Sequence, residues 1–398
     1  MSMNAAPSAN RVHIGFFGRR NAGKSSLMNA IAGQELAVVS DVKGTTTDPV
    51  LKSMEILPLG PVVLIDTPGM DDVGELGEMR VKKARQAMRR CDIALLVVDS
   101  AEGLTDEDER LLGMFRERKL PHIVVWNKAD LVPGFQPEDG MRVSAKTGEN
   151  VHELKERIGH MLPKGSDKRL VADLLEPGDT VVLVIPIDEA APKGRLILPQ
   201  QQTIRDVLEA GCSVIACRDT ELPETLAKLK DKPKMVITDS QAFGRVAKDT
   251  PEDILMTSFS ILMARFKGDL RQQVEGAAAL SKLKDGDKVL VSEGCTHHRQ
   301  CGDIGSVKIP NWIRKFTGAQ PLFTFTSGND FPEEISEYAL ILHCGGCMLN
   351  EREMSYRLKT AKEMGVPIAN YGVAIAQMHG ILRRSLEPFP DILKILDE

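Results

Sequence analysis

The feature that most limits the possible folds of this chain is the segment GRRNAGKS at residues 18–25. It follows the apolar run VHIGFF and opens an amphipathic stretch, so it joins a predicted strand to a predicted helix. Glycines at such a turn leave backbone N–H groups free to surround phosphate oxygens. Lys24 adds a positive charge for the β and γ oxygens, and Ser25 offers a hydroxyl to magnesium. The segment therefore predicts a phosphate-binding loop in a mostly parallel α/β domain.

Short apolar runs alternate with amphipathic stretches along the rest of the chain, which predicts an α/β fold throughout. A length of 398 residues allows two or three domains. The segment LPKGSDKRL, at residues 162–170, has the composition of a linker. We predict three α/β domains, at residues 1–165, 170–267 and 268–398.

The composition limits the class of protein. A net charge of −5 without a strongly basic block does not favour nucleic-acid binding. We find no signal peptide and no apolar run of about 18 residues, so we expect no membrane span. Seven cysteines, an odd number, indicate a reducing cytoplasm, where paired cysteines more often bind metal or take part in redox chemistry than form disulfides.

The stretch PEDILMTSFSILMARF, at residues 251–266, is expected to form a helix that is apolar on more than one face. Such a helix is a candidate for the interface of a homodimer. Packing into the core of its own domain explains the pattern equally well.

Three further segments complete a nucleotide site. DTPG, at residues 66–69, ends a predicted strand, so Asp66 can hold the magnesium shell and the Gly69 amide can sense a γ-phosphate. NKAD, at residues 127–130, ends another strand, and Asp130 can accept two N–H bonds from the edge of guanine. SAK, at residues 144–146, offers a backbone amide to the guanine oxygen. In this order, the four elements resemble those of the Ras-like GTPases of the translation-factor class.

The loop GRRNAGKSS together with GTTTD, at residues 44–48, resembles the branch of GTPases that contains Era and the tRNA-modifying enzyme MnmE. This resemblance implies that Thr46 closes on magnesium and that Asn21 helps to hold a potassium ion beside the phosphates. A plain loop-capping role for Asn21 remains the alternative. Met70 stands where Ras-like enzymes place a glutamine, so we expect slow hydrolysis, on the order of 10⁻⁴ to 10⁻² s⁻¹.

We predict that Lys24, Thr46 and Asp66 are the catalytic residues of GTP hydrolysis. The full set predicted to bind GTP or GDP is Gly18, Asn21, Gly23, Lys24, Ser25, Ser26, Thr46, Asp66, Gly69, Asn127, Lys128, Asp130, Ser144, Ala145 and Lys146.

A second group of chemical interest lies near the C-terminus. Cys295 and His297 follow the apolar run KVLVSE, and the segment HCGGC, with His343, Cys344 and Cys347, follows YALILH. Ligands gather outside the carboxyl ends of parallel strands, so the two segments are expected to face one another. Three thiols and two imidazoles suit either an iron–sulfur cluster or a Cys₃His zinc site, and a site without metal is the third alternative.

Other residues of ligand type have no spacing that selects them. Cys301, His298 and Glu293 lie near the predicted ligands and are expected to be bystanders. Cys91, Cys212 and Cys217 lie in or beside apolar runs and are expected to be core residues.

The combination of a potassium-type GTPase loop, a middle α/β domain and C-x-H…H-C-x-x-C resembles the HydF family, the maturation GTPases of FeFe (diiron) hydrogenase. The resemblance implies an N-terminal GTPase domain, a middle dimerisation domain and a C-terminal domain that binds a 4Fe-4S cluster through Cys295, Cys344 and Cys347. It leaves the fourth position exchangeable, with His297 and His343 as candidates. It also implies a transient diiron precursor, made with radical-SAM hydrogenase maturases and delivered to apo-hydrogenase.

Two other functions compete with that of a scaffold that carries the diiron precursor. A GTPase that acts on RNA would need an RNA-binding module, and no such module is recognisable in the sequence. A GTP-regulated zinc protein would use the same cysteines for a structural metal. The identity of the metal separates this last hypothesis from the scaffold.

Overall fold

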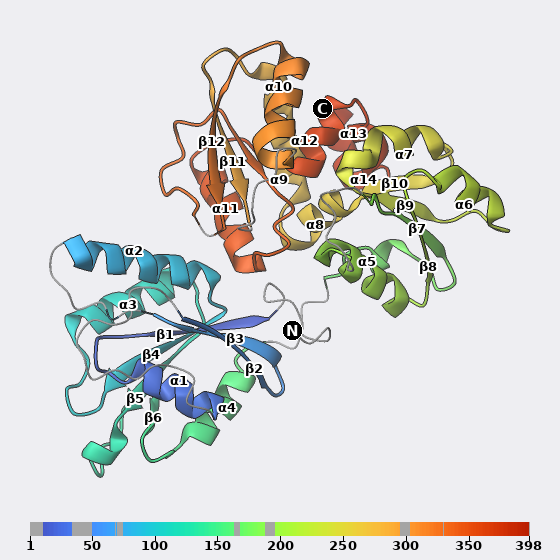
Figure 1. The fold of residues 1–398 in the computed structure, drawn as a ribbon. Helices are drawn as coiled ribbons and strands as arrows, with labels where there is room; N and C mark the ends of the chain where they lie inside the picture. The colour runs from blue at the N-terminus through green and yellow to red at the C-terminus, as the bar shows by residue number, and fades with distance from the viewer. Residues whose placement is uncertain are drawn as a thin grey trace. The chain divides into compact units, whose positions relative to one another are not determined.

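The structure, a computed structural model, describes residues 11–33, 50–67, 69, 75–162, 168–187, 196–294, 303–328 and 330–397. The chain forms two compact units, residues 1–166 and 167–398 (Figure 1). Parallel strands joined by helices build both units, which confirms the predicted α/β class. The second unit contains the predicted middle and C-terminal domains, whose boundary at residues 267 and 268 stays a prediction. In the part of the chain that the structure describes, no helix is long and apolar enough to cross a membrane.

The first unit is built on a six-stranded sheet with the order β2-β3-β1-β4-β5-β6. Only the β2–β3 pair is antiparallel, and β2 is a strand that the sequence did not predict. The strands are β1 Val12–Phe17, β2 Val50–Ile56, β3 Gly60–Asp66, β4 Ile93–Asp99, β5 His122–Asn127 and β6 Met141–Arg142. The helices are α1 Lys24–Ala32, α2 Glu75–Arg90, α3 Asp106–Glu117 and α4 Val151–Gly159.

Helices cover both faces of this sheet, because successive side chains of a strand point to opposite sides. On β1, Phe16 joins a core formed with α1 and α4, whereas its neighbour Phe17 joins a core formed with α2 and α3. Strands that are buried on both faces read as continuous apolar runs, and β4 is buried along its whole length.

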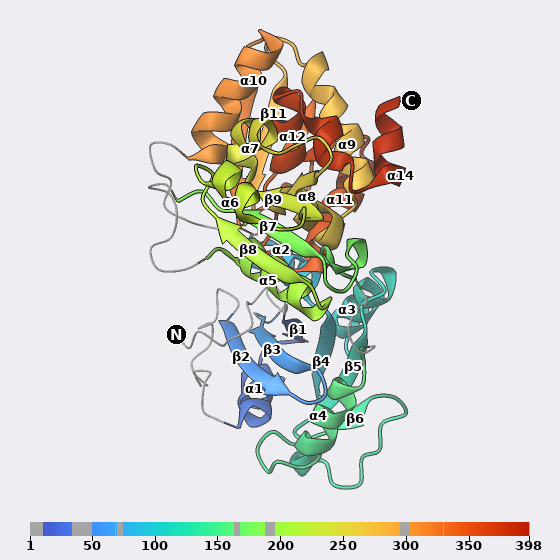
Figure 2. The ribbon, with the colours of Figure 1, turned by 90° about the vertical axis from the view of Figure 1, so that its right-hand side faces the viewer.

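The second unit contains two four-stranded parallel sheets, ordered β10-β9-β7-β8 and β12-β11-β13-β14. The first consists of β7 Thr180–Val184, β8 Ser213–Cys217, β9 Met235–Thr238 and β10 Leu255–Ser258, and α5 packs on β8 (Figure 2). The second consists of β11 Lys288–Glu293, β12 Leu322–Ser327, β13 Leu340–His343 and β14 Ile368–Asn370. The helices are α5 Leu198–Glu209, α6 Leu222–Lys228, α7 Phe243–Asp249, α8 Phe259–Lys267, α9 Leu270–Ala277, α10 Ile309–Thr317, α11 Glu351–Glu363, α12 Tyr371–Met378, α13 Leu382–Leu386 and α14 Pro390–Leu393.

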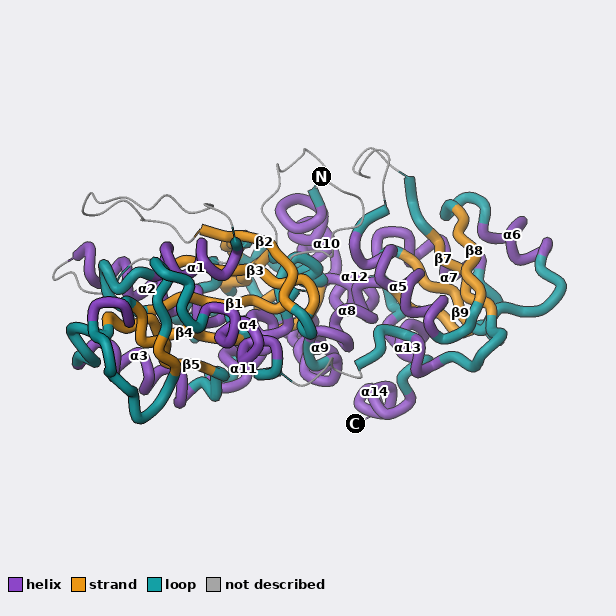
Figure 3. Tube along the Cα trace, turned by 90° about the horizontal axis from the view of Figure 1, so that it is seen from below, coloured by secondary structure: helices purple, strands orange, loops and turns teal. Residues whose placement is uncertain are grey.

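The apolar stretch at residues 251–266 differs from its prediction as one helix. Leu255–Ser258 forms the strand β10, and the helix α8 covers only Phe259–Lys267. The side chain of Ser258 accepts a hydrogen bond from the Ile261 amide, and this N-cap starts the helix after the strand. Helix α8 packs beside α12 (Figure 3), and most of its apolar side chains belong to the core of the unit. Core packing, the second of the two explanations, therefore accounts for its apolar faces.

Candidate functional site

The phosphate-binding loop lies where the sequence predicts it, between the end of β1 and the start of α1. The side chain of Lys24 is buried, and its ammonium donates to the carbonyl oxygens of Gly18 at 3.0 Å and Arg19 at 2.6 Å. Gly18 has φ 132°, and a Cβ there would lie 2.3 Å from the Val97 carbonyl oxygen. Glycine is thus required at this position, both for its backbone conformation and for the close approach of β4.

The predicted magnesium ligands are brought together by the pairing of β1 with β3. Asp66 ends β3, and its Oδ2 accepts a hydrogen bond of 2.5 Å from Ser25 Oγ at the start of α1. A hydroxyl beside a carboxylate is a donor set that suits a hard cation such as magnesium. Gly69 lies against the phosphate-binding loop, since a Cβ there would be 2.7 Å from the backbone nitrogen of Arg20. Thr46 lies outside the described residues.

Asn21 is exposed at the tip of the loop and has a left-handed backbone, with φ 60°. Asparagine tolerates this conformation better than most residues, so the loop geometry alone explains part of its presence. Its role in binding potassium stays a prediction.

The predicted base-binding residues converge on the carboxyl end of β5. Asn127 donates from Nδ2 to the Ala22 carbonyl at 3.0 Å and accepts at Oδ1 from the Ala145 amide at 3.0 Å, so it ties this region to the phosphate loop. Ser144 donates to Asp130 Oδ1 at 2.7 Å, and this hydrogen bond holds the pKa of Asp130 below its usual value. Asp130 therefore stays ionised and able to accept N–H bonds. Lys128 pairs with Asp99 at 2.7 Å.

Two cysteines of the second site lie on a turn directly after β13. The parallel register of β11 and β13 places Ser292 opposite His343, so the two strands end at the same edge of the sheet. The Sγ atom of Cys344 accepts hydrogen bonds from the Gly294 amide at 3.0 Å and the Gly346 amide at 3.4 Å. The contact from Gly294 shows that the end of β11 reaches the cysteine turn, as the sequence predicts.

The environment of these thiols suits a soft metal. Burial raises the pKa of Cys344 to about 11, against the opposing hydrogen bonds from Gly294 and Gly346, and burial also raises the pKa of Cys347. A metal must therefore displace the thiol protons, after which the amide N–H groups stabilise the thiolates. Cys295 and His297 lie outside the described residues, and the described residues alone hold no group of three or more metal-binding side chains.

His343 is held in a buried polar network. Arg357, which is fully buried, donates to His343 Nε2 at 2.9 Å and to Ser292 Oγ at 3.1 Å, and it pairs with Glu353 at 2.8 Å. Because arginine only donates, Nε2 must be the acceptor, so the proton is on Nδ1 and points to the Cys344 carbonyl at 2.7 Å. Burial, followed by the charge of Arg357, lowers the pKa of His343 to about 3. Ligation by His343 would require Nε2 to leave Arg357, and it stays a prediction.

Sequence reasoning missed Lys267, Glu353 and Arg357. Lys267 is buried at the end of α8 and donates to backbone carbonyls of the cysteine turn. Burial lowers its pKa to about 8, and the negative charges of ionised Cys347 and Cys344 and of Glu351 oppose that shift. The four-residue spacing of Glu353 and Arg357 was a usable signal for their ion pair. The burial of Lys267 had no such signal, because a lysine in the last turn of a helix is normally exposed.

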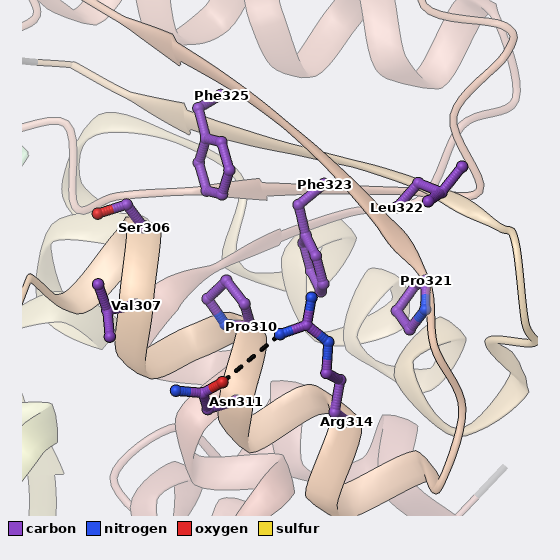
Figure 4. Close-up of a pocket in the computed structure, with 9 residues that line it drawn as sticks. All are labelled: Ser306, Val307, Pro310, Asn311, Arg314, Pro321, Leu322, Phe323 and Phe325. Carbon is purple, nitrogen blue, oxygen red and sulfur yellow. Dashed lines mark hydrogen bonds between the residues drawn. The ribbon is translucent and has the colours of Figure 1, made fainter.

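A separate groove of about 340 Å³ lies between α10 and the edge strand β12 (Figure 4). Arg314 stacks over the ring of Phe323 in this groove, with its carbon Cζ 5.2 Å from the ring centroid. Phe325 lines the same wall. None of the predicted ligands is among its lining residues in the described part of the chain.

Comparisons with known proteins place the three parts of the chain. Residues 13–128 match the family described as 50S ribosome-binding GTPase. The tRNA modification GTPase MnmE of Chromobacterium violaceum is 40% identical over 158 residues, which are 38% of this chain and 35% of that protein. GTPase Der of Clostridium acetobutylicum is 33% identical over 169 residues, 37% of this chain and 38% of that protein. The chain thus spans about a third of the length of these curated relatives.

Among solved structures, Era of Aquifex aeolicus bound to GDP and aluminium fluoride aligns with 52% of this chain and 92% of its own. The identity is 23% and the TM-score is 0.36, too low to support an inference.

The remainder of the chain matches two domains of a single family. Residues 170–268 match the hydrogen maturase F dimerization domain, and residues 271–388 match the hydrogen maturase F tetramerization domain. Together these two matches cover more than half of the chain, and they follow a P-loop GTPase domain as the sequence predicts. The chain therefore belongs to the hydrogen maturase F family.

Proposed function

We propose that this protein is a GTPase that acts as a scaffold in the maturation of FeFe-hydrogenase. It holds a diiron precursor of the active site at a 4Fe-4S cluster and delivers it to apo-hydrogenase. The observation that carries the proposal is the hydrogen bond of 3.0 Å from the Gly294 amide to Cys344 Sγ, in a chain of this family. It brings the strand end that leads to Cys295 beside the turn with Cys344 and Cys347, as three thiols for one cluster require.

Cys295, Cys344 and Cys347 would hold the cluster, and the bound cluster would supply an iron with an exchangeable ligand, at which the precursor docks. We assign the fourth position to His297 in preference to His343, because Arg357 already engages Nε2 of His343. The precursor is cargo that radical-SAM maturases would provide. Dimerisation and tetramerisation of the chain would follow from its two family domains.

The nucleotide site would act as a slow switch. Lys24 and the loop amides would bind the phosphates, while Ser25, Asp66 and Thr46 would hold magnesium. Asp130 would select guanine, because its ionised carboxylate accepts the two N–H bonds that adenine does not present there. Magnesium, when bound, supplies charge that stabilises the transferring phosphoryl group.

We expect potassium to stimulate GTP hydrolysis about tenfold over sodium, equal to ~1.4 kcal/mol of barrier. Asn21→Gly should remove most of this difference, since glycine accepts the φ of 60° but lacks the side-chain carboxamide whose oxygen would bind potassium. Steady-state phosphate release in matched potassium and sodium buffers measures the effect. Equal rates in the two ions for the unaltered protein would remove the role given to Asn21.

If the protein is a scaffold, it should make apo-hydrogenase active by transferring the diiron precursor to it. Protein purified anaerobically from cells that also produce the radical-SAM maturases should activate apo-hydrogenase, whereas protein produced without them should not. Hydrogen evolution after mixing measures the transfer. If both preparations fail while the maturases are active, the carrier role is wrong, whatever the rate of GTP hydrolysis.

A further inference from the structure

Lys267, the last residue of α8, has a side chain that is only 3% exposed. Its ammonium donates to the carbonyl oxygens of Gly346 at 3.2 Å, Cys347 at 3.0 Å and Leu349 at 2.7 Å. Three acceptors use three N–H groups, and a lysine has three only as a charged ammonium. The geometry therefore places a positive charge against the turn that follows Cys344.

This arrangement is costly for a residue that only fills space. An ammonium taken out of water loses several kcal/mol of hydration unless partners compensate. Among the described residues, no carboxylate forms an ion pair with Lys267 within 4 Å, and its hydrogen-bond partners are three uncharged carbonyl groups. The Glu351 carboxylate acts on it only through its charge from a longer distance. Methionine has a side chain of similar length and would fill the same volume without this cost. A negative charge bound at the turn would offset the cost of burying the Lys267 ammonium.

Helix α8 is well placed to fix the turn. Gly345 lies beside it, since a Cβ there would be 3.7 Å from the Ser260 hydroxyl oxygen. The turn itself is folded by a hydrogen bond from the Leu349 amide to the Gly346 carbonyl at 3.0 Å. Lys267 donates to the carbonyl oxygens of both Gly346 and Leu349, so it holds the two ends of this turn together. It belongs to the segment matched by the dimerization domain, whereas the turn belongs to the segment matched by the tetramerization domain.

We propose that Lys267 is a positioning residue for the iron–sulfur site: it fixes the turn between Cys344 and Leu349, and its charge stabilises the reduced cluster. The second part rests on the proposed function, because it requires a cluster at these cysteines. One-electron reduction makes the cluster more negative by one charge, and a nearby fixed positive charge favours that state. In the experiment below the electron comes from dithionite, and no bond is formed or broken.

Two substitutions separate the two roles. Lys267→Gln keeps two N–H donors but removes the charge, whereas Lys267→Met removes both. Lys248→Gln is the matched control, because Lys248 is an exposed lysine on α7 of the same unit. Protection from hydrogen exchange in the buried strands β7 and β9 verifies that the second unit of each variant is folded, because GTP hydrolysis in the other unit does not report on it.

The first readout needs no cluster. In the metal-free protein, the amides of Gly346 and Leu349 should exchange hydrogen at least about tenfold faster in Lys267→Met than in the unaltered protein. The reason is that the turn loses its hydrogen bonds from Lys267. Lys267→Gln should lie between the two, and Lys248→Gln should match the unaltered protein. Unchanged exchange in Lys267→Met would overturn the positioning role, even if the protein proved to hold no iron.

The second readout is the midpoint potential of the reconstituted cluster, from a dithionite titration followed by EPR. Lys267→Gln should reduce the ratio of reduced to oxidised cluster about tenfold at a fixed potential, a shift of about −59 mV for one electron. If Lys267→Met does not fold, Lys267→Gln carries this test alone. An unchanged potential in a variant with full iron content would overturn the charge role, whereas an unaltered protein without cluster would instead contradict the proposed function.

Discussion

Replacement of Lys24 by alanine is expected to reduce GTP hydrolysis by about 10²–10³-fold, the usual cost of one lost transition-state donor. Lys24 is the buried ammonium of the phosphate loop, where its donors now meet the carbonyl groups of Gly18 and Arg19. Nucleotide phosphates offer stronger acceptors for the same donors. From an initial rate on the order of 10⁻⁴ to 10⁻² s⁻¹, the loss abolishes measurable turnover. Single-turnover hydrolysis of labelled GTP measures it.

The matched control for this variant is Lys119→Ala, which removes an exposed lysine from the same unit. It should hydrolyse GTP at the unaltered rate. Lys24→Ala should also keep its full iron content, because the cysteine turn lies in the second unit. Loss of iron from Lys24→Ala would show that the two units do not hold their ligands independently.

The second large effect is expected from Cys344→Ser combined with Cys347→Ser. Iron content after anaerobic reconstitution should fall to background, because serine offers no thiolate and two of the three proposed cysteine ligands are removed. GTP hydrolysis should be unchanged. Colorimetric iron and sulfide analysis measures the loss.

The control for this variant is Cys212→Ser combined with Cys217→Ser, in the same unit. Both of these cysteines pack with the core of that unit, and neither is a predicted ligand. This pair should retain iron. Iron retained in Cys344→Ser with Cys347→Ser would mean that the cluster lies elsewhere in the chain.

The sequence predicts the parallel strands well, because strands buried on both faces appear as short apolar runs between helices. It missed β2, an edge strand with the sequence VLKSMEI, because polar residues interrupt the apolar run that marks the other strands. It also merged β10 with α8, because both are apolar and no glycine or proline separates them. Periodicity alone cannot place such a boundary, which here is set by the N-cap at Ser258.

The candidate sites were predictable to the extent that ligands recur at fixed spacings. The nucleotide loop and the strand-end position of Cys344 follow from the sequence, and the structure places them accordingly. The supporting residues do not follow from it, since the tautomer of His343 depends on Arg357, which lies on a separate helix. The contact of Lys267 with the turn likewise depends on how α8 packs, which no local pattern encodes.

The central claim is that the cysteine turn carries an iron–sulfur cluster. Low-temperature EPR of the reconstituted, dithionite-reduced protein tests it most directly, beside the variant that lacks Cys344 and Cys347. We expect a fast-relaxing spin-½ signal from the unaltered protein and none from the variant. An EPR-silent protein with stoichiometric zinc would contradict it, because HCGGC would then hold a structural metal and the scaffold would lose the site at which its cargo docks.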